Sequence, residues 1–264
     1  MLHYTITGSG PALVLLHGFP DNHAIWSDVI PALAAHYTVI APDLSGAGNS
    51  PLAGQMLLSD MADEIAALLQ HLGISKAVIA GHSMGGYTAL AFARQYSHMV
   101  AGVSMINSTS KPDDEEKKET RRKVIALIEN GGREVFVRQM TPNLFAPQFA
   151  ATQPQVLNHK LSIAIQMQEE GIINCYKAMI ARPDSTDVLQ NASFPVQWIR
   201  GLHDNIVDFR KSLSECQLSP INFVSLYRNS GHMSHLEEPE MFVSDLLYFS
   251  DFCSSPDKCK PFQY

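Results

Sequence analysis

Short apolar runs rich in β-branched residues recur along the chain, and turn-forming residues bound each of them. Runs such as Ala-Leu-Val-Leu-Leu at 12–16 are apolar without interruption, which is typical of strands covered on both faces in a parallel sheet. The pattern predicts seven strands, at His3–Thr7, Ala12–His17, Tyr37–Asp43, Lys76–His82, Val100–Asn107, Val196–Gly201 and Ile221–Tyr227.

Segments with helical periodicity separate these runs. They are Ala24–Ala35, Leu58–Leu72, Gly85–Gln95, Val207–Cys216 and Glu240–Phe252. Alternation of strands and helices is typical of a doubly wound α/β sheet. We therefore predict an α/β fold with a mostly parallel central sheet flanked by helices.

The alternation stops between Lys111 and Ser193, where no strand pattern is found. Pro112, followed by three acidic residues, predicts a helix start, because Pro and acids suit a helix N-terminus. Gly131-Gly132 would end this helix, and a second helical stretch runs from about Val156 to Arg182. The predicted organisation is a core of residues 1–110 and 194–264 with a helical cap at 111–193.

The first helix of this insertion carries a run of charges. Three pairs have the favourable i,i+4 order and predict a solvated helix face. They are Asp113–Lys117, Asp114–Lys118 and Glu119–Lys123.

Composition narrows the classes of protein. The 264 residues are 45% hydrophobic and 17% charged, which is enough to build a core. A formal net charge of −7 disfavours nucleic acid as a partner. The apolar runs are much shorter than the roughly 20 residues that cross a bilayer. Met1-Leu2-His3-Tyr4 lacks the basic and apolar regions of a signal peptide. We expect a cytoplasmic protein without membrane insertion.

The cysteines predict neither a disulfide framework nor a metal site. They are scattered, none forms a CxxC, and the histidines lack metal-ligand spacing. The four are Cys175, Cys216, Cys253 and Cys259. A pair between Cys253 and Cys259 is disfavoured by a reducing cytoplasm but stays open.

A candidate nucleophile follows the fourth predicted strand. Gly81-His82-Ser83-Met84-Gly85 is a G-x-S-x-G motif that ends a strand and begins a helix. Such a turn holds the serine hydroxyl at the carboxyl edge of the sheet, and its glycines avoid Cβ clashes. The motif predicts Ser83 as a nucleophile.

A serine hydroxyl needs a base that is oriented by an acid. Asp204 lies in the loop after Val196–Gly201, and His232 lies in the loop after the last strand. This chain order of serine, acid and histidine predicts a triad. His235 as the base and Asp208 as the acid are less favoured alternatives.

The oxyanion of an acyl-transfer intermediate needs preorganised donors. Met84 begins a helix, where backbone N–H groups are free. The loop His17-Gly18-Phe19-Pro20 follows an early strand. We predict the N–H groups of Phe19 and Met84 as the two donors.

Five motifs together resemble the α/β-hydrolase superfamily, over nearly the whole chain outside 111–193. They are His17-Gly18-Phe19-Pro20, Asp43-Leu44-Ser45-Gly46-Ala47-Gly48-Asn49-Ser50, Gly81-His82-Ser83-Met84-Gly85-Gly86, Gly201-Leu202-His203-Asp204, and Gly231-His232 with Glu238-Pro239. The resemblance implies Ser83 as nucleophile, His232 as base, Asp204 as orienting acid, and 111–193 as a cap over the site. The family usually opens with an antiparallel hairpin, of which this chain shows one strand, His3–Thr7.

Within the superfamily the chain is similar to carboxylesterases and enol-lactonases. Haloalkane dehalogenases and epoxide hydrolases use Asp where this chain has Ser83. Epoxide hydrolases also use cap tyrosines, and residues 111–193 contain Tyr176 alone. C–C hydrolases often place Asn before the serine, where this chain has His82.

These features predict hydrolysis of a small-molecule ester, lactone or thioester through an acyl-Ser83 intermediate, without cofactor or metal. The pocket candidates are the cap residues Phe136, Met140, Leu144 and Phe145. An apolar cap favours a small or medium acyl group over a charged substrate. Cofactor-free perhydrolase, haloperoxidase or lyase chemistry on the same triad, and a non-catalytic ligand-binding protein, stay open as alternatives.

Overall fold

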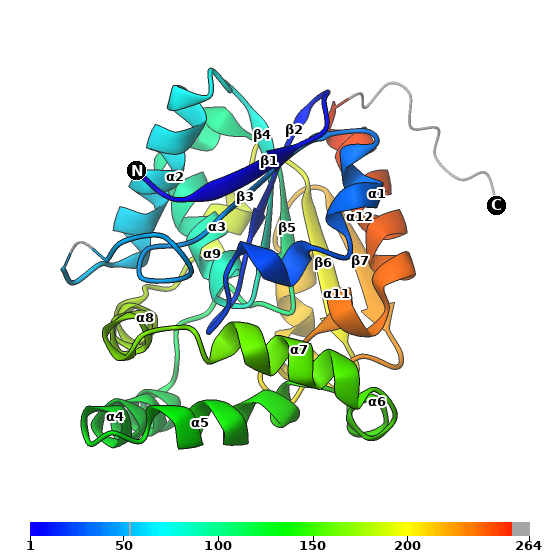
Figure 1. Ribbon diagram of the computed structural model, residues 1–264. Coiled ribbons are helices and arrows are strands. Elements are labelled where there is room, and N and C mark those ends of the chain that lie inside the picture. The colour runs from blue at the N-terminus through cyan, green and yellow to red at the C-terminus, as the bar shows by residue number, and fades with distance from the viewer. Residues whose placement is uncertain (53, 255–264) are drawn as a thin grey trace.

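The computed structural model describes residues 1–52 and 54–254, and at its centre lies a seven-stranded sheet (Figure 1). The strand order is β1-β3-β2-β4-β5-β6-β7. β1 pairs antiparallel with β3, and the other neighbouring pairs are parallel. The strands are β1 Tyr4–Thr7, β2 Ala12–Leu16, β3 Thr38–Pro42, β4 Ala77–His82, β5 Val100–Ile106, β6 Val196–Gly201 and β7 Asn222–Tyr227.

All seven predicted strands are confirmed to within one residue at each end. The inner strands are buried on both faces: each residue of β4 is buried, as are Leu13–Leu16 of β2. This double burial is the physical reason for their uninterrupted apolar sequences. β1 forms one edge of the sheet, and no described residue forms a strand beyond it.

Helices cover both faces of the sheet (Figure 1). α2 Leu58–His71, α3 Met84–Gln95 and α9 Thr186–Gln190 lie on one face. α1 Ile30–Ala34, α11 Ser234–Glu237 and α12 Pro239–Ser254 lie on the other. Two apolar cores result, one on each side of the sheet. No helix of the described residues has the length and apolarity needed to cross a membrane.

Two predicted helices are shorter than expected. Ala24–Ala35 is divided into a 3₁₀ turn at His23–Trp26 and the short helix α1. Pro31 stands in the first turn of α1, because proline lacks the N–H that a helix interior needs. Val207–Cys216 becomes α10 Phe209–Ser212 followed by a 3₁₀ turn, and Asp208 caps α10 by accepting from the Arg210 N–H.

Five further helices lie together across one end of the sheet (Figure 1). They are α4 Glu115–Glu129, α5 Arg133–Met140, α6 Pro147–Thr152, α7 Pro154–Ala164 and α8 Glu169–Ala181. The single helical stretch predicted at Val156–Arg182 is wrong, since α7 ends at Ala164 and α8 begins at Glu169. Two acids in the first turn of α8 stabilise this start through the helix dipole.

The predicted charge pairs of α4 are also wrong. The helix begins at Glu115, and Asp114 caps it by accepting from the Lys117 N–H. Lys118 binds Glu115, and Arg122 binds Glu119. Asp113 is buried instead of solvated, and it binds two arginines, Arg121 and Arg182. Periodicity along one helix cannot reveal this tertiary contact.

A fully buried ion pair joins α7 to the loop after β2. Lys160 Nζ lies 2.8 Å from Asp21 Oδ1, and both side chains are inaccessible. Lys160→Met would leave the Asp21 charge buried without a partner, so we expect the free energy of unfolding to fall by about 3–5 kcal/mol. Urea denaturation followed by circular dichroism measures this loss.

The matched control is the exposed pair Arg138–Glu134 on α5, where both side chains are more than half exposed. Arg138→Met should change the free energy of unfolding by less than about 1 kcal/mol. Equal effects of the two substitutions would contradict a structural role for the buried pair.

The sequence leaves the pairing of Cys253 with Cys259 open. Cys259 lies outside the described residues.

Candidate active site

Ser83 occupies a strained turn between β4 and α3. Its φ of 50° and ψ of −113° lie in a region that non-glycine residues rarely adopt. The turn is crowded: a Cβ on Gly81 would clash with the backbone of Gly85, and one on Gly85 would clash with the Leu16 carbonyl. The Ser83 N–H donates to the Ile106 carbonyl over 2.9 Å, which fixes the turn on the sheet.

The three predicted triad residues meet at the carboxyl edge of the sheet. Ser83 Oγ lies 2.8 Å from His232 Nε2, and His232 Nδ1 lies 2.8 Å from Asp204 Oδ2. Asp204 follows β6 and His232 follows β7, so parallel neighbours bring them together. Both distances are those of good hydrogen bonds, so the three side chains form a continuous hydrogen-bonded chain.

The Asp204 carboxylate accepts further hydrogen bonds. Its Oδ1 accepts from the N–H groups of Ile206 and Val207, and its Oδ2 accepts from Asn107 Nδ2. Burial alone would raise the pKa of Asp204, but His232 and the backbone donors outweigh it, so the pKa lies below its ordinary value. The carboxylate is therefore ionised at neutral pH. No sequence motif pointed to Asn107.

The loop that carries His232 is held by Glu237. This carboxylate accepts from the N–H groups of Gly231 and Met233, on both sides of His232, and from that of Ala146. The His232 N–H donates to the Leu144 carbonyl over 2.7 Å. These bonds fix the histidine loop against the segment between α5 and α6. No sequence motif pointed to Glu237.

The alternative base and acid have other surroundings. His235 is buried against the rings of Trp26 and His82, and neither of its ring nitrogens has a hydrogen-bond partner among the described residues. Burial, with Lys160 and His232 nearby, lowers the pKa of His235 to about 3. Asp208 is the cap of α10. Neither side chain is hydrogen-bonded to Ser83.

The loop after β2 is held by His17. Its Nδ1 pairs with the Gly18 carbonyl at 2.7 Å, and its Nε2 accepts from the Leu44 N–H at 2.9 Å. Phe19 lies in the wall of the cavity that contains Ser83. Met84 is the first residue of α3, so its N–H has no partner within the helix. Both predicted donors thus stand at this edge of the sheet.

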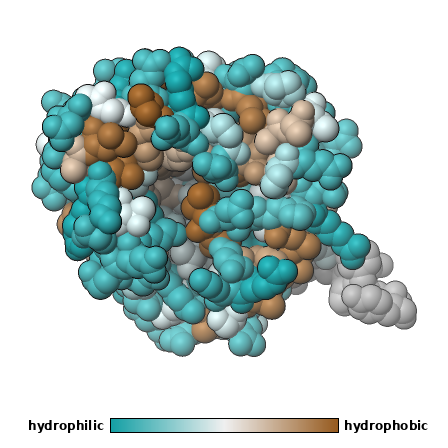
Figure 2. Space-filling view, turned by 90° about the horizontal axis from the view of Figure 1, so that it is seen from below, coloured by the Kyte–Doolittle hydropathy of each residue, from teal (hydrophilic) through white to brown (hydrophobic). Residues whose placement is uncertain are grey.

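A cleft with about 730 Å³ of empty space opens over Ser83 and His232. Seen from the side of α4 to α8, the surface is largely hydrophilic and is hollowed near its middle (Figure 2). We refer to this cleft as the Ser83 cavity. Besides these two residues its lining is Phe19, Tyr87, Lys117, Thr120, Arg121, Val124, Met140, Leu144, Tyr176, Met179 and Ile206.

Two of the four pocket candidates, Met140 and Leu144, line the Ser83 cavity. Phe136 instead packs edge-on against Tyr176, and Phe145 stacks on Phe149 away from the cavity wall. The direction of each side chain within residues 111–193 decides whether it lines the cavity. The expectation of an apolar wall is wrong in part, since Lys117 and Arg121 belong to it.

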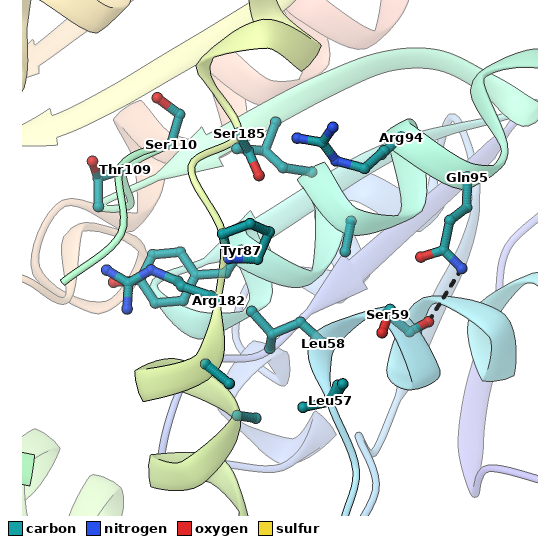
Figure 3. A pocket seen from close by; sticks show the side chains of 15 residues that line it. Leu57, Leu58, Ser59, Tyr87, Arg94, Gln95, Thr109, Ser110, Arg182 and Ser185 are labelled. Carbon is teal, nitrogen blue, oxygen red and sulfur yellow. Dashed lines mark hydrogen bonds between the residues drawn. The ribbon is translucent and has the colours of Figure 1, made fainter. Parts of the chain in front are cut away.

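A second cavity lies between α2, α3 and the segment from α8 to α9 (Figure 3). Tyr87 borders both cavities, and the Arg182 guanidinium stacks over its ring at 4.1 Å. At its far side, Gln95 Nε2 donates to the Ser59 carbonyl. Neither Ser83 nor His232 lines this cavity. Of these two cavities, the one that contains the hydrogen-bonded serine and histidine is therefore the Ser83 cavity.

Among the described residues, His3, His23 and Asp43 form a group with metal-ligand chemistry. Asp43 is buried, and its carboxylate accepts from the rings of both histidines and from the backbone of His23 and Asn49. Burial would raise the pKa of Asp43, but these partners lower it overall. The group anchors the Gly-rich loop after β3, and none of it lines the Ser83 cavity.

Comparisons with known proteins agree with this fold. A family profile of the alpha/beta hydrolase fold matches residues 11–125. The solved structure of an esterase from Thermogutta terrifontis superposes with a TM-score of 0.89 at 32% identity, over 93% of this chain and 91% of that one.

Two curated relatives differ in coverage. A soluble epoxide hydrolase from Corynebacterium is 48% identical over 94 residues, which are 35% of this chain and 32% of that protein. The match thus spans about a third of that relative. A 3-oxoadipate enol-lactonase from Acinetobacter baylyi is 24% identical over 94% of this chain and 90% of its own length. The order of the sheet, the hydrogen-bonded serine, histidine and aspartate, and the likeness to these relatives all lead to the same conclusion. The chain belongs to the α/β-hydrolase family.

Proposed function

We propose that this protein is a serine hydrolase that cleaves carboxylic ester-type bonds, including lactones and thioesters. The observation that carries the proposal is the continuous relay from Ser83 through His232 to Asp204, with both hydrogen bonds at 2.8 Å, inside a cavity that a small molecule can enter. The esterase and enol-lactonase relatives support the same bond type.

In the proposed reaction, Ser83 Oγ attacks the carbonyl carbon while His232 Nε2 accepts the serine proton. Asp204 holds the proton on His232 Nδ1 and stabilises the imidazolium that forms. The N–H groups of Phe19 and Met84 stabilise the oxyanion. His232 then donates its proton to the leaving oxygen or sulfur, and an acyl-Ser83 remains. A water molecule, activated by His232, hydrolyses this ester and restores the serine.

Epoxide hydrolysis is not favoured, despite the partial match to an epoxide hydrolase and the two tyrosines, Tyr87 and Tyr176, in the cavity wall. Attack of a serine oxygen on an epoxide carbon would form an alkyl ether. Unlike an ester, an ether has no carbonyl that water can attack, so the enzyme would stay blocked. A carbonyl substrate lets Ser83 be regenerated.

We also propose that residues 111–193 act as the cap of the active site. Lys117, Met140 and Tyr176 of this segment face Ser83 and His232 across the cavity. The Lys160–Asp21 pair and the Glu237–Ala146 bond tie the same segment to the core. A cap held in this way excludes water from the acylation step, which strengthens the electrostatic interactions at the reacting carbonyl.

Reaction of the purified protein with a fluorophosphonate probe tests the proposal. We expect labelling of Ser83, seen as one added mass by intact mass spectrometry and located by peptide mapping, together with turnover of p-nitrophenyl esters. Protein that is neither labelled nor active on any ester would contradict a serine hydrolase and favour ligand binding without turnover. Turnover of peroxide and acetate without ester hydrolysis would favour the perhydrolase alternative.

A further inference from the structure

Two cationic side chains of α4, Lys117 and Arg121, form part of the Ser83 cavity wall. No Asp or Glu is among the described residues that line it. The remaining wall is mostly apolar or aromatic. Such a cavity is positively charged on the side of α4, and its other walls can pack against the hydrocarbon part of a ligand.

The charge of Arg121 is balanced in part. Arg121 Nε donates to Asp113, and Arg182 Nη2 donates to the same carboxylate over 2.8 Å. Burial would raise the pKa of Asp113, but the two guanidinium groups lower it overall, so it is ionised. One carboxylate thus serves two guanidinium groups, and this buried cluster keeps one net positive charge.

The ammonium group of Lys117 has no carboxylate partner among the described residues. Its Nζ donates to the Ile206 carbonyl over 3.1 Å, and an ammonium group has three donors. Two nearby acids are engaged elsewhere: Asp114 caps α4, and Glu115 binds Lys118. Two donors of Lys117 therefore have room for an acceptor supplied by a ligand.

The contact with Ile206 places Lys117 close to the triad. Ile206 donates its N–H to Asp204 Oδ1 and accepts from Lys117 through its carbonyl. The head of Lys117 therefore lies on the loop that carries the orienting acid. A substrate whose ester carbonyl is at Ser83 could reach Lys117 with a second functional group.

We propose that the Ser83 cavity selects substrates that carry a carboxylate besides the scissile ester, and that Lys117 binds this carboxylate and determines specificity. The chemical class is the half-ester or lactone of a short dicarboxylic acid. The anionic end would make charge-assisted hydrogen bonds with Lys117, while the methylene chain packs on residues such as Val124 and Met140. This inference rests on the proposed ester hydrolysis.

Two six-carbon acyl substrates provide the test: the mono-p-nitrophenyl ester of adipic acid and p-nitrophenyl hexanoate. They differ in a terminal carboxylate against a terminal methyl group. The measured quantity is the ratio of their kcat/KM values, corrected for spontaneous hydrolysis. The wild-type protein should prefer the adipate ester by about tenfold, as a hydrogen bond to a charged group would give.

Lys117→Met should bring this ratio close to one, mainly through a higher KM for the adipate ester, and Lys117→Glu should reverse the preference. Lys118→Met is the matched control, because Lys118 binds Glu115 and does not line the cavity. It should keep the wild-type ratio. Added NaCl should reduce the ratio of the wild type, since salt screens the attraction.

A wild-type protein that hydrolyses both esters equally well, or a Lys117→Met variant that keeps the wild-type ratio, would overturn the carboxylate site and leave the ester hydrolase intact. Absence of turnover with either ester, together with absence of fluorophosphonate labelling, would instead overturn the proposed function. The two failures are therefore distinguishable.

Discussion

Ser83→Ala is expected to lower kcat for ester hydrolysis by a factor on the order of 10⁶. The substitution removes the oxygen that lies 2.8 Å from His232 Nε2, so no acyl-enzyme can form. Stability should change little, because the Ser83 backbone makes its hydrogen bond to Ile106 without the side chain. Steady-state kinetics with a p-nitrophenyl ester, at enzyme concentrations high enough to detect residual turnover, measure the loss.

Ser97→Ala provides a control on the exposed turn after α3, which lies beyond the end of the helix opposite to Ser83. It should retain wild-type kcat and fluorophosphonate labelling, whereas Ser83→Ala should lose both. Ester turnover by Ser83→Ala at more than about one hundredth of the wild-type rate would be incompatible with covalent catalysis at Ser83.

Asp204→Asn should lower kcat by a factor on the order of 10⁴ near neutral pH. An asparagine amide would donate toward His232 Nδ1, so the histidine proton would reside on Nε2. In that tautomer Nε2 points a hydrogen at Ser83 and cannot accept the serine proton. The hydrogen bonds of Ile206 and Val207 to Oδ1 remain possible, so the loop should keep its shape.

Asp208→Asn is the matched control, since Asp208 is the competing acid in the same loop region and is the cap of α10. We expect it to keep kcat within about threefold and to cost at most about 1 kcal/mol of stability, because asparagine also caps helices. The reverse pattern, with activity lost in Asp208→Asn and retained in Asp204→Asn, would reassign the acid.

The lowered pKa of Asp204 also predicts how its contribution depends on pH. A carboxyl whose folded pKa lies below its unfolded value of 3.8 stabilises the native state above that pH. This contribution is lost as the pH falls through the folded pKa. Asp113, whose pKa is lowered by Arg121 and Arg182, behaves in the same way. Both contributions therefore act fully at neutral pH and disappear in strong acid.

The relation of Ser83, Asp204 and His232 could be predicted because each follows a strand of a parallel sheet. The carboxyl ends of such strands lie at one edge, so chain order and strand position bring the residues together. The strands themselves could be predicted since burial on both faces requires nearly unbroken apolar runs. Only two of the four pocket candidates, Met140 and Leu144, line the cavity. Which side chains of residues 111–193 face Ser83 depends on how these helices pack on the core, and the local sequence does not determine that.

Other features depend on contacts between segments far apart in the chain. Glu237 holds the histidine loop, and Asn107 donates a hydrogen bond to Asp204. No sequence pattern around either residue indicates these contacts. A charged helix such as α4 has the same pattern whether it faces solvent or a cavity. The local sequence therefore determined the sheet, the strained serine turn and the order of the catalytic groups. Tertiary packing decided that Asp113 is buried and that Lys117 faces the active site, because burial of a charge depends on the partners that other helices and loops bring to it.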